Sequence, residues 1–259
     1  MSQLQTIVVV VACLLFVGLY FGGDTNPETQ VAIEKTRAVR ATSTSIESIL
    51  PTAKSKLSAD TSAMIMSIER ELVASQTDSL KVGQLKKLAG LWYDAGRADI
   101  SGHYAKEIAD LINTEESWSI AGTTFMLGAR KAKEAKIRDF CFSNASTAFE
   151  NAISINPSNY THKVNLALCF TENPPKGNPM KGILMLRDYN QEAPENVLVL
   201  TTLARLAIQT NQLEKAIERL NTAIRVEPDN KKANCLMVQA YDGLGNKEKA
   251  AQYAAKCID

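Results

Sequence analysis

Two histidines and five cysteines are the residues of this chain best suited to chemistry. His103 and His162 lie far apart in the sequence without ligand-spaced neighbours, so solvated or capping roles are expected for both. The cysteines form no CxxC pair, and their odd number and wide spacing indicate neither a disulfide framework nor a zinc site. We expect them to be buried as small apolar residues, a usage that favours a reducing compartment. They are Cys13, Cys141, Cys169, Cys235 and Cys257.

Sequence motifs for catalysis are absent from the chain. It has no Walker motif, dinucleotide-binding glycine motif, nucleophile elbow or zinc-protease motif. The loop-like stretch 173–179 lacks the glycine pattern that lets backbone amides surround a phosphate. Glu115 and Glu116 stand at an expected helix start, where acidic side chains stabilise the helix dipole. The sequence therefore predicts no enzyme, no metal site and no cofactor.

A dense group of cations lies between residues 130 and 138, in what we interpret as a long insertion between two helices. A solvated extension of a helix explains it, and contact with anionic lipid headgroups or an acidic partner is the functional alternative. Nucleic acid is not expected, because no aromatic residues are interleaved for base stacking. The group consists of Arg130, Lys131, Lys133, Lys136 and Arg138, with Glu134 and Asp139 offsetting part of the charge.

Composition and charge favour a helical protein without a strong overall field. The chain has 259 residues, a formal net charge of +1 and only 6% aromatic residues. This charge does not point to nucleic acid or acidic substrates, and the composition suits packed helices better than sheets.

The elements that would position any site are clearest at 197–230. Apolar residues recur there at helical spacing in two runs, and Pro228 ends the second run. A Pro-x-Asn sequence occurs three times, ending in Asn159, Asn196 and Asn230, where each asparagine can cap the next helix. Two helices this short cannot bury their apolar stripes alone, so neighbouring units are required.

This pattern resembles the tetratricopeptide repeat (TPR), a helix-turn-helix unit of 34 residues. Repeats with more or less complete motifs account for residues 80–259 in about five units. The resemblance implies an all-α fold, an α-solenoid. The residues that carry it are Leu200, Leu203, Ala204, Ala207, Ala216, Leu220, Ala223 and Pro228; Met237, Tyr241, Gly245, Ala250 and Ala254; Leu85, Leu88, Ala89, Trp92, Gly96 and Ala105; and Trp118, Gly122 and Phe125.

Some positions depart from the repeat. Ala145 comes about eleven residues late in its unit, and a Pro- and Gly-rich insertion occupies 171–179. Lys163 and Asn234 stand where the family prefers a large apolar residue.

Residues 1–23 contain no charged side chain and predict a transmembrane helix that contacts the bilayer through residues 4–21. A cleaved signal would need a basic residue before the apolar run and small residues after it, and a lipoprotein at Cys13 would not continue apolar beyond the cysteine. We therefore expect a retained single-pass anchor, as in a bacterial inner membrane.

The basic residues after the anchor predict its membrane topology, and helix-breaking residues divide the segment that follows. Lys35, Arg37 and Arg40 favour a cytoplasmic domain by the positive-inside rule, with the periplasm as the alternative. Residues 24–79 predict a linker and two or three helices, broken at 42–45 and at Pro51, which form a stalk or an N-terminal cap.

The resemblance also implies a binding face, because TPR arrays bind peptides in a concave groove lined by the first helix of each unit. By this analogy the lining includes Ile120, Thr123, Thr161, Asn165, Leu168, Thr201, Thr202, Arg205, Lys232 and Gln239. The carboxylate clamp of chaperone-binding relatives is not predicted, because Val164, Leu168, Thr202 and Leu236 occupy its places and only Lys232 matches.

Two functions remain open at this stage. The first is a membrane-anchored scaffold or adaptor that binds a protein or peptide in the groove, with a chaperone-like role at a membrane complex as one form of it. The second is a structural subunit of a membrane-associated assembly, packed through the ends or convex face of the solenoid, which the expected lack of a cap on the last helix favours.

Overall fold

The computed structural model describes residues 44–257 of the chain. This part belongs to one compact unit. No helix within it is long and apolar enough to cross a membrane. The predicted anchor, residues 1–23 with its bilayer segment 4–21, lies outside the described residues, as do Lys35, Arg37 and Arg40.

Residues 44–257 contain twelve helices and no strand. The all-helical expectation is therefore confirmed for this part of the chain. The helices are α3 (Ile46–Lys54), α4 (Ala59–Ala74), α5 (Asp78–Asp94), α6 (Ala98–Ile112), α7 (Glu115–Lys131), α8 (Ala135–Ile155), α9 (Tyr160–Glu172), α10 (Lys181–Glu192), α11 (Val197–Gln209), α12 (Leu213–Val226), α13 (Lys231–Gly243) and α14 (Lys247–Ala254).

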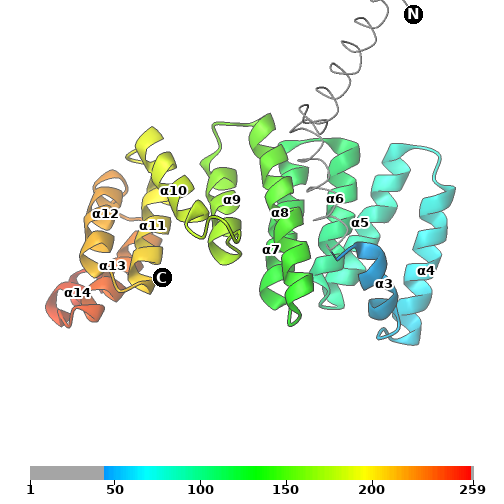
Figure 1. Ribbon diagram of the computed structural model, residues 1–259, viewed down its shortest axis with the longest axis horizontal. Coiled ribbons are helices and arrows are strands. Elements are labelled where there is room, and N and C mark those ends of the chain that lie inside the picture. Colours follow the sequence, from blue (N-terminus) through cyan, green and yellow to red (C-terminus); the bar gives the residue numbers. More distant parts are fainter. Residues whose placement is uncertain (1–43, 258–259) are drawn as a thin grey trace, which may run out of the picture. The chain divides into compact units, whose positions relative to one another are not determined.

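Helices α5 to α14 form five consecutive pairs, in which the two members pack against each other and each pair contacts the next. Figure 1 shows the helices following one another in chain order, from α4 at one end to α14 at the other. Such an array buries a continuous core between neighbours, as expected of repeats that cannot fold singly. The exact boundaries 24–79 and 80–259 remain a prediction.

The three predicted asparagine caps are present. The side-chain oxygen of Asn159 accepts the Thr161 amide at 2.9 Å, and that of Asn230 accepts the Ala233 amide at 2.9 Å. Asn196 does the same for Val199 at 3.1 Å. Each cap satisfies a backbone donor that the helix itself leaves unpaired, which fixes where α9, α11 and α13 begin.

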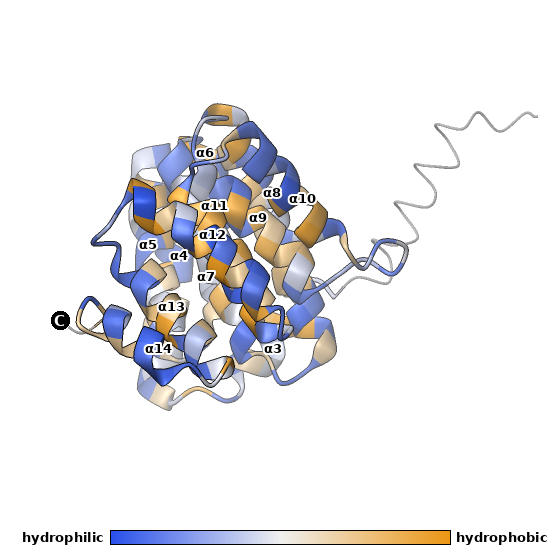
Figure 2. Cartoon of the chain, turned by 90° about the vertical axis from the view of Figure 1, so that its left-hand side faces the viewer, coloured by the Kyte–Doolittle hydropathy of each residue, from blue (hydrophilic) through white to orange (hydrophobic). Residues whose placement is uncertain are grey.

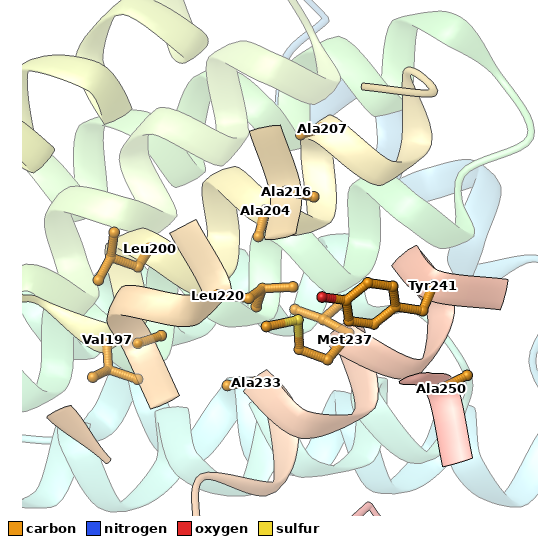
Figure 3. Close-up of a cluster of buried hydrophobic side chains, with 12 residues drawn as sticks. Val197, Leu200, Ala204, Ala207, Ala216, Leu220, Ala233, Met237, Tyr241 and Ala250 are labelled. Atoms are coloured by element: carbon orange, nitrogen blue, oxygen red, sulfur yellow. The ribbon is translucent and has the colours of Figure 1, made fainter. Parts of the chain in front are cut away.

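The core at the C-terminal end depends on alanines at helix crossings. Figure 3 shows side chains of α11, α12, α13 and α14 pointing toward one another, with Ala204 and Ala216 beside Leu220 and Met237. Ala204, Ala216 and Leu220 are fully buried. Helices approach this closely only where side chains are small, so the predicted repeat register is consistent with the packing.

Helices α3 and α4 pack onto the array at the N-terminal side. Ile49 and Ile65 join a buried cluster with Leu88 and Trp92. The expectation that Pro51 breaks the chain is wrong, because Pro51 lies inside α3 and the break falls at 55–58 instead. Burial of the apolar residues around it offsets the one backbone hydrogen bond that a proline removes.

The cationic group at 130–138 lies mostly in extended helices, as one of the two interpretations expected, and not in a long segment between them. Arg130 and Lys131 end α7, whereas Lys136 lies in the first turn of α8, and only residues 132–134 connect the helices. The additional residues lengthen both helices instead, to 17 residues in α7 and 21 in α8, compared with 13 in α11. The expected insertion at 171–179 does form a loop, which covers residues 173–180 between α9 and α10.

The prediction that no cysteine forms a disulfide is wrong. Cys235 of α13 is bonded to Cys257, which follows α14, with their Cα atoms 4.8 Å apart. The α13–α14 hairpin brings together two residues that are 22 positions apart. Cys141 and Cys169 are free and buried, as predicted. Cys13 lies outside the described residues.

This disulfide compensates for a weak last helix. Helix α14 is largely hydrophilic (Figure 2), and Ala250 is its one buried residue. The segment after it turns back, where the Lys256 ammonium lies 2.9 Å from the Asp229 carboxylate. The bond and this ion pair hold the end of the chain on α13, so the last helix is less exposed to fraying than the sequence suggested.

Cys257→Ser should therefore loosen the last helix pair selectively. Closing a loop of this size stabilises a fold by about 3 kcal/mol in the chain-entropy description. We expect hydrogen exchange in α13 and α14 to accelerate, with α5 to α8 unchanged, because repeats contact only their neighbours. Wild type treated with a reductant is the control and should match the variant. Equal exchange in untreated wild type and the variant would contradict this role.

Candidate functional site

A pocket of about 580 Å³ lies between α5, α6 and α7. Helices α5 and α7 are the first members of neighbouring pairs, and α6 lies between them in the chain. The rim exposes apolar side chains, since Tyr93, Ile112 and Ile120 are 51%, 42% and 52% accessible. The lining consists of Lys86, Ala89, Gly90, Tyr93, Ser101, Ala105, Ile108, Ile112, Thr114, Glu116, Ser117, Ile120 and Thr124.

Small residues on α5 keep this pocket open. Gly90 lines it, and a Cβ atom built at Gly90 would meet no heavy atom within 4 Å. Gly122 of α7 is a contrast, because a Cβ there would lie 2.7 Å from the Phe149 ring. Gly122 permits close packing of helices, whereas Gly90 leaves a space that no atom of the described residues fills.

The opposite wall is fixed by the start of α7. The Thr114 hydroxyl accepts the Ser117 amide at 3.2 Å, and the Ser117 hydroxyl accepts the Thr114 amide at 3.1 Å. This reciprocal capping box orients the first turn of the helix. Asn113 precedes it with a φ of 50° and accepts the Trp118 indole N–H at 2.9 Å. The pocket wall is thus rigid on the α7 side.

The predicted binding residues of α7 and α9 are placed unequally around this pocket. Ile120 lines it, whereas Thr123 is exposed and donates its hydroxyl to the Ser119 carbonyl at 2.8 Å. Thr161 is exposed, Asn165 is half-buried, and Leu168 packs partly against two buried clusters. None of these three lines the pocket.

The predicted residues of α11 also differ in their accessibility. Thr201 and Thr202 are 1% and 2% exposed, and both donate their hydroxyls to the Leu198 carbonyl. Arg205 is half-buried. Partial burial of the Lys232 amine lowers the pKa of that lysine, and the nearby charge of Arg205 lowers it further. No ion pair of Arg205 occurs within residues 44–257.

Lys232 and Gln239 of α13 are exposed. Arg205 of α11 and Lys232 of α13 therefore place two positive charges near each other, each on the first helix of its pair. A carboxylate is the group that such a pair favours, because it would relieve their mutual repulsion.

Sequence reasoning missed most of the pocket because it began the lining at Ile120. The hollow depends on the preceding helix pair, where Gly90 and Tyr93 lie on α5 and Ile108 lies on α6. The signal available in the sequence was an aromatic residue, Tyr93, three positions after Gly90 on a helix that otherwise fits the repeat.

A polar network joins α7 to α9. One Glu115 oxygen accepts the Asn159 amide at 2.7 Å and lies 2.7 Å from His162 Nε2, while the other accepts the Asn156 amide at 2.9 Å. These hydrogen bonds, that from Asn156 first, lower the pKa of Glu115. His162 is 4% exposed, so of the two roles expected for it, solvated or capping, the solvated one is wrong.

The remaining candidates for chemistry are placed as follows. His103 lies 3.5 Å from Glu107 on the same helix face. Within residues 44–257 no group of His, Cys, Asp or Glu is arranged to hold a metal ion. Burial raises the pKa of the Cys141 and Cys169 thiols to about 12, so neither is poised as a nucleophile.

Comparisons with known proteins agree with the repeat architecture. A sequence model of the tetratricopeptide repeat matches residues 177–233, and a second one matches residues 232–259. Residues 177–259 therefore carry tetratricopeptide repeats, a fold that typically mediates interactions between proteins rather than catalysis. Comparison with curated proteins gives no significant match.

Several solved structures are similar to this chain at low identity. TTC0263, a TPR protein of Thermus thermophilus, is 16% identical with a TM-score of 0.48, over 71% of this chain and 90% of its own. MamA of Desulfovibrio magneticus RS-1 is 17% identical with a TM-score of 0.43, over 68% and 92%. YrrB, described as having an unusual peptide-binding site, is 14% identical with a TM-score of 0.39, over 68% and 84%. None of these likenesses says what this chain binds.

The Glu115 network generates a pH-dependent prediction. Because the folded pKa of Glu115 is lowered, its contribution is present above the ordinary carboxyl pKa of about 4 and is lost as the pH falls through the folded value. Glu115→Gln should lower the melting temperature at pH 7, and the difference from wild type should shrink in acid. Glu116→Gln, one residue along, is the control. A constant difference at all pH values would argue against the network.

Proposed function

We propose that this chain is a protein-binding scaffold that holds a partner segment against α5 and α7. One observation carries the proposal: the pocket of about 580 Å³ has an apolar rim open to solvent and is lined by Gly90, which leaves room for a foreign side chain. Apolar side chains that fill such pockets dominate the energetics of many interfaces.

Positive charges on the first helices of several pairs support a partner that carries acidic residues. Lys86 stands at the pocket, while Arg205 and Lys232 stand together further along the array. Glu116 is the acidic residue at the pocket. A segment with a large apolar side chain and acidic residues on its C-terminal or N-terminal flank would complement this arrangement.

The predicted anchor makes this a membrane-attached scaffold, and a chaperone-like role is one form it would take. The alternative, a structural subunit, is favoured by a different feature. Helix α4 ends the array with Met66 and Val73 exposed at 55% and 89%, a face suited to permanent packing in an assembly. The C-terminal end no longer favours it, since the Cys235–Cys257 bond secures that end.

We also propose that the domain lies in the periplasm. The Cys235–Cys257 disulfide supports this compartment, because such bonds persist in oxidising surroundings and are rare in the cytosol. The buried state of Cys141 and Cys169 is compatible with it, since neither thiol is accessible for unwanted oxidation. The positive-inside charge of Lys35, Arg37 and Arg40 remains the argument for the cytoplasm.

Filling the pocket should weaken binding through it. Gly90→Trp places an indole in the hollow and, by replacing a helical glycine, should not lower stability. Peptides are first enriched from a random phage-displayed library on the full wild-type chain, and their affinities are measured by fluorescence anisotropy. We expect the variant to lose about tenfold or more in affinity, the contribution of one buried apolar side chain.

Gly83→Trp is the matched control for this experiment. Gly83 lies two turns earlier on α5, also has open space around its Cβ position, and does not line the pocket. Affinity should be kept in this variant. Enriched peptides that bind wild type and Gly90→Trp equally would place the binding surface elsewhere, and a library that yields no binder would count against peptide recognition altogether.

The compartment is tested by the thiol state in intact cells. Cells are quenched with acid, and the full chain is labelled with a maleimide of known mass before and after reduction. A periplasmic domain should show two additional labelled cysteines after reduction, and Cys257→Ser should show none. Complete labelling before reduction would return the domain to the cytoplasm.

A further inference from the structure

Two adjoining hollows mark one edge of the helix array. The larger, of about 210 Å³, is formed by the α5–α6 turn and the α7–α8 connection. The smaller, of about 100 Å³, adds the outer side of α3 and the turn after it. They share Arg97, Glu134 and Ile137, so they form one continuous surface. We call this surface the basic edge, and its charged residues are Lys56, Arg97, Asp99, Lys131, Lys133, Glu134 and Lys136.

The basic edge has more positive charge than its own carboxylates neutralise. Arg97 donates to both Asp99 oxygens, at 2.9 and 2.6 Å, and Lys136 lies 3.1 Å from Glu134. These two pairs use both carboxylates of the edge. Its other three cations are Lys56, Lys131 and Lys133. They form no ion pair with any residue from 44 to 257, although the whole chain is nearly neutral.

Close packing fixes the backbone next to Lys131 and Lys133. A Cβ atom at Gly128 would lie 2.7 Å from the Asp99 amide nitrogen, so the end of α7 presses directly on the start of α6. Lys131 follows within one turn, and the α7–α8 connection is only three residues long. Lys131 is therefore carried on the end of a packed helix and Lys133 on a short connection.

The described part of the chain begins at this same edge. Thr44, the first described residue, lines the smaller hollow together with Ser48 and Thr52 of α3. The predicted anchor ends at residue 23, so residues 24–43 alone separate it from the edge. Even fully extended, twenty residues reach only about 70 Å, which is the upper limit on the distance between this edge and the end of the predicted anchor.

We propose that the basic edge binds the anionic headgroups of phospholipids and thereby fixes the orientation of the helix array on the membrane. Three cations without internal partners match a plane of phosphates, each gaining from proximity to it. Hydroxyl groups of Thr44 and Thr52 beside them suit phosphate oxygens. No aromatic residue lines either hollow, so nucleic-acid bases would find no stacking surface there.

Lysine footprinting on the full chain tests this proposal without knowledge of any protein partner. After detergent removal, the chain is associated with vesicles of phosphatidylcholine alone or with about a third phosphatidylglycerol. A water-soluble amine reagent then labels exposed lysines, and mass spectrometry measures each site. We expect labelling of Lys56, Lys131 and Lys133 to fall at least about threefold in the anionic vesicles, and to recover in high salt.

Two sets of controls make the result specific. Lys81 and Lys232 lie in the first turns of α5 and α13 and should label equally in both vesicles. Replacing Lys131, Lys133 and Lys136 by Gln should restore labelling of Lys56 in anionic vesicles. Replacing Lys81, Lys87 and Lys232 by Gln, which removes the same charge elsewhere, should leave the protection of Lys56 intact.

Equal labelling of the basic edge in neutral and anionic vesicles would overturn the proposal. Protection of these lysines by an added acidic protein or oligonucleotide, but not by anionic vesicles, would assign the edge to that partner instead. Protection that is the same for Lys81 and Lys232 would indicate nonspecific adsorption and would also overturn it. Gly90→Trp, the variant that fills the pocket, should leave the lysine footprint unchanged, so this test is separate from that of the pocket.

Discussion

The structure depends on how closely its helices approach one another. A Cβ atom at Gly122 would strike the Phe149 ring, and one at Gly128 would strike the backbone of Asp99. Ala204 and Ala216 are fully buried at equivalent close contacts further along the chain. Each contact sets the distance between neighbouring helices, and the distances are passed from pair to pair because each pair packs mainly on its neighbours.

The pocket and the basic edge both follow from this close packing. Where the small residue meets another helix, as at Gly128, the end of α7 that carries Lys131 packs directly on the start of α6. Where the small residue meets nothing, as at Gly90, a hollow remains between α5 and α7. The same type of residue therefore permits close helix packing in one place and leaves a hollow in the other, depending on the neighbouring helix.

This distinction explains what could be predicted from the sequence. The pairing of helices was accessible, because spacing and caps such as Asn230 are local signals. The Cys235–Cys257 bond was not, since it depends on how α13 and α14 fold back on each other. The site shows the same limit of prediction. Thr202 was expected in the groove but is buried, whereas Gly90 lines the pocket and was not expected. Which first-helix residues face the groove depends on helix rotation, which a repeat motif specifies only to within about a residue.

The disulfide also decides how this molecule responds to a pull at its C-terminus. Tension applied there passes through the Cys257 side chain into Cys235 and so bypasses the eight-residue helix α14. The load then enters the array through the second turn of α13, whose start is anchored by Asn230. Helix α14 cannot be peeled away from its end in the manner of an ordinary terminal helix. An attachment at this terminus would load the solenoid as though the chain ended inside α13.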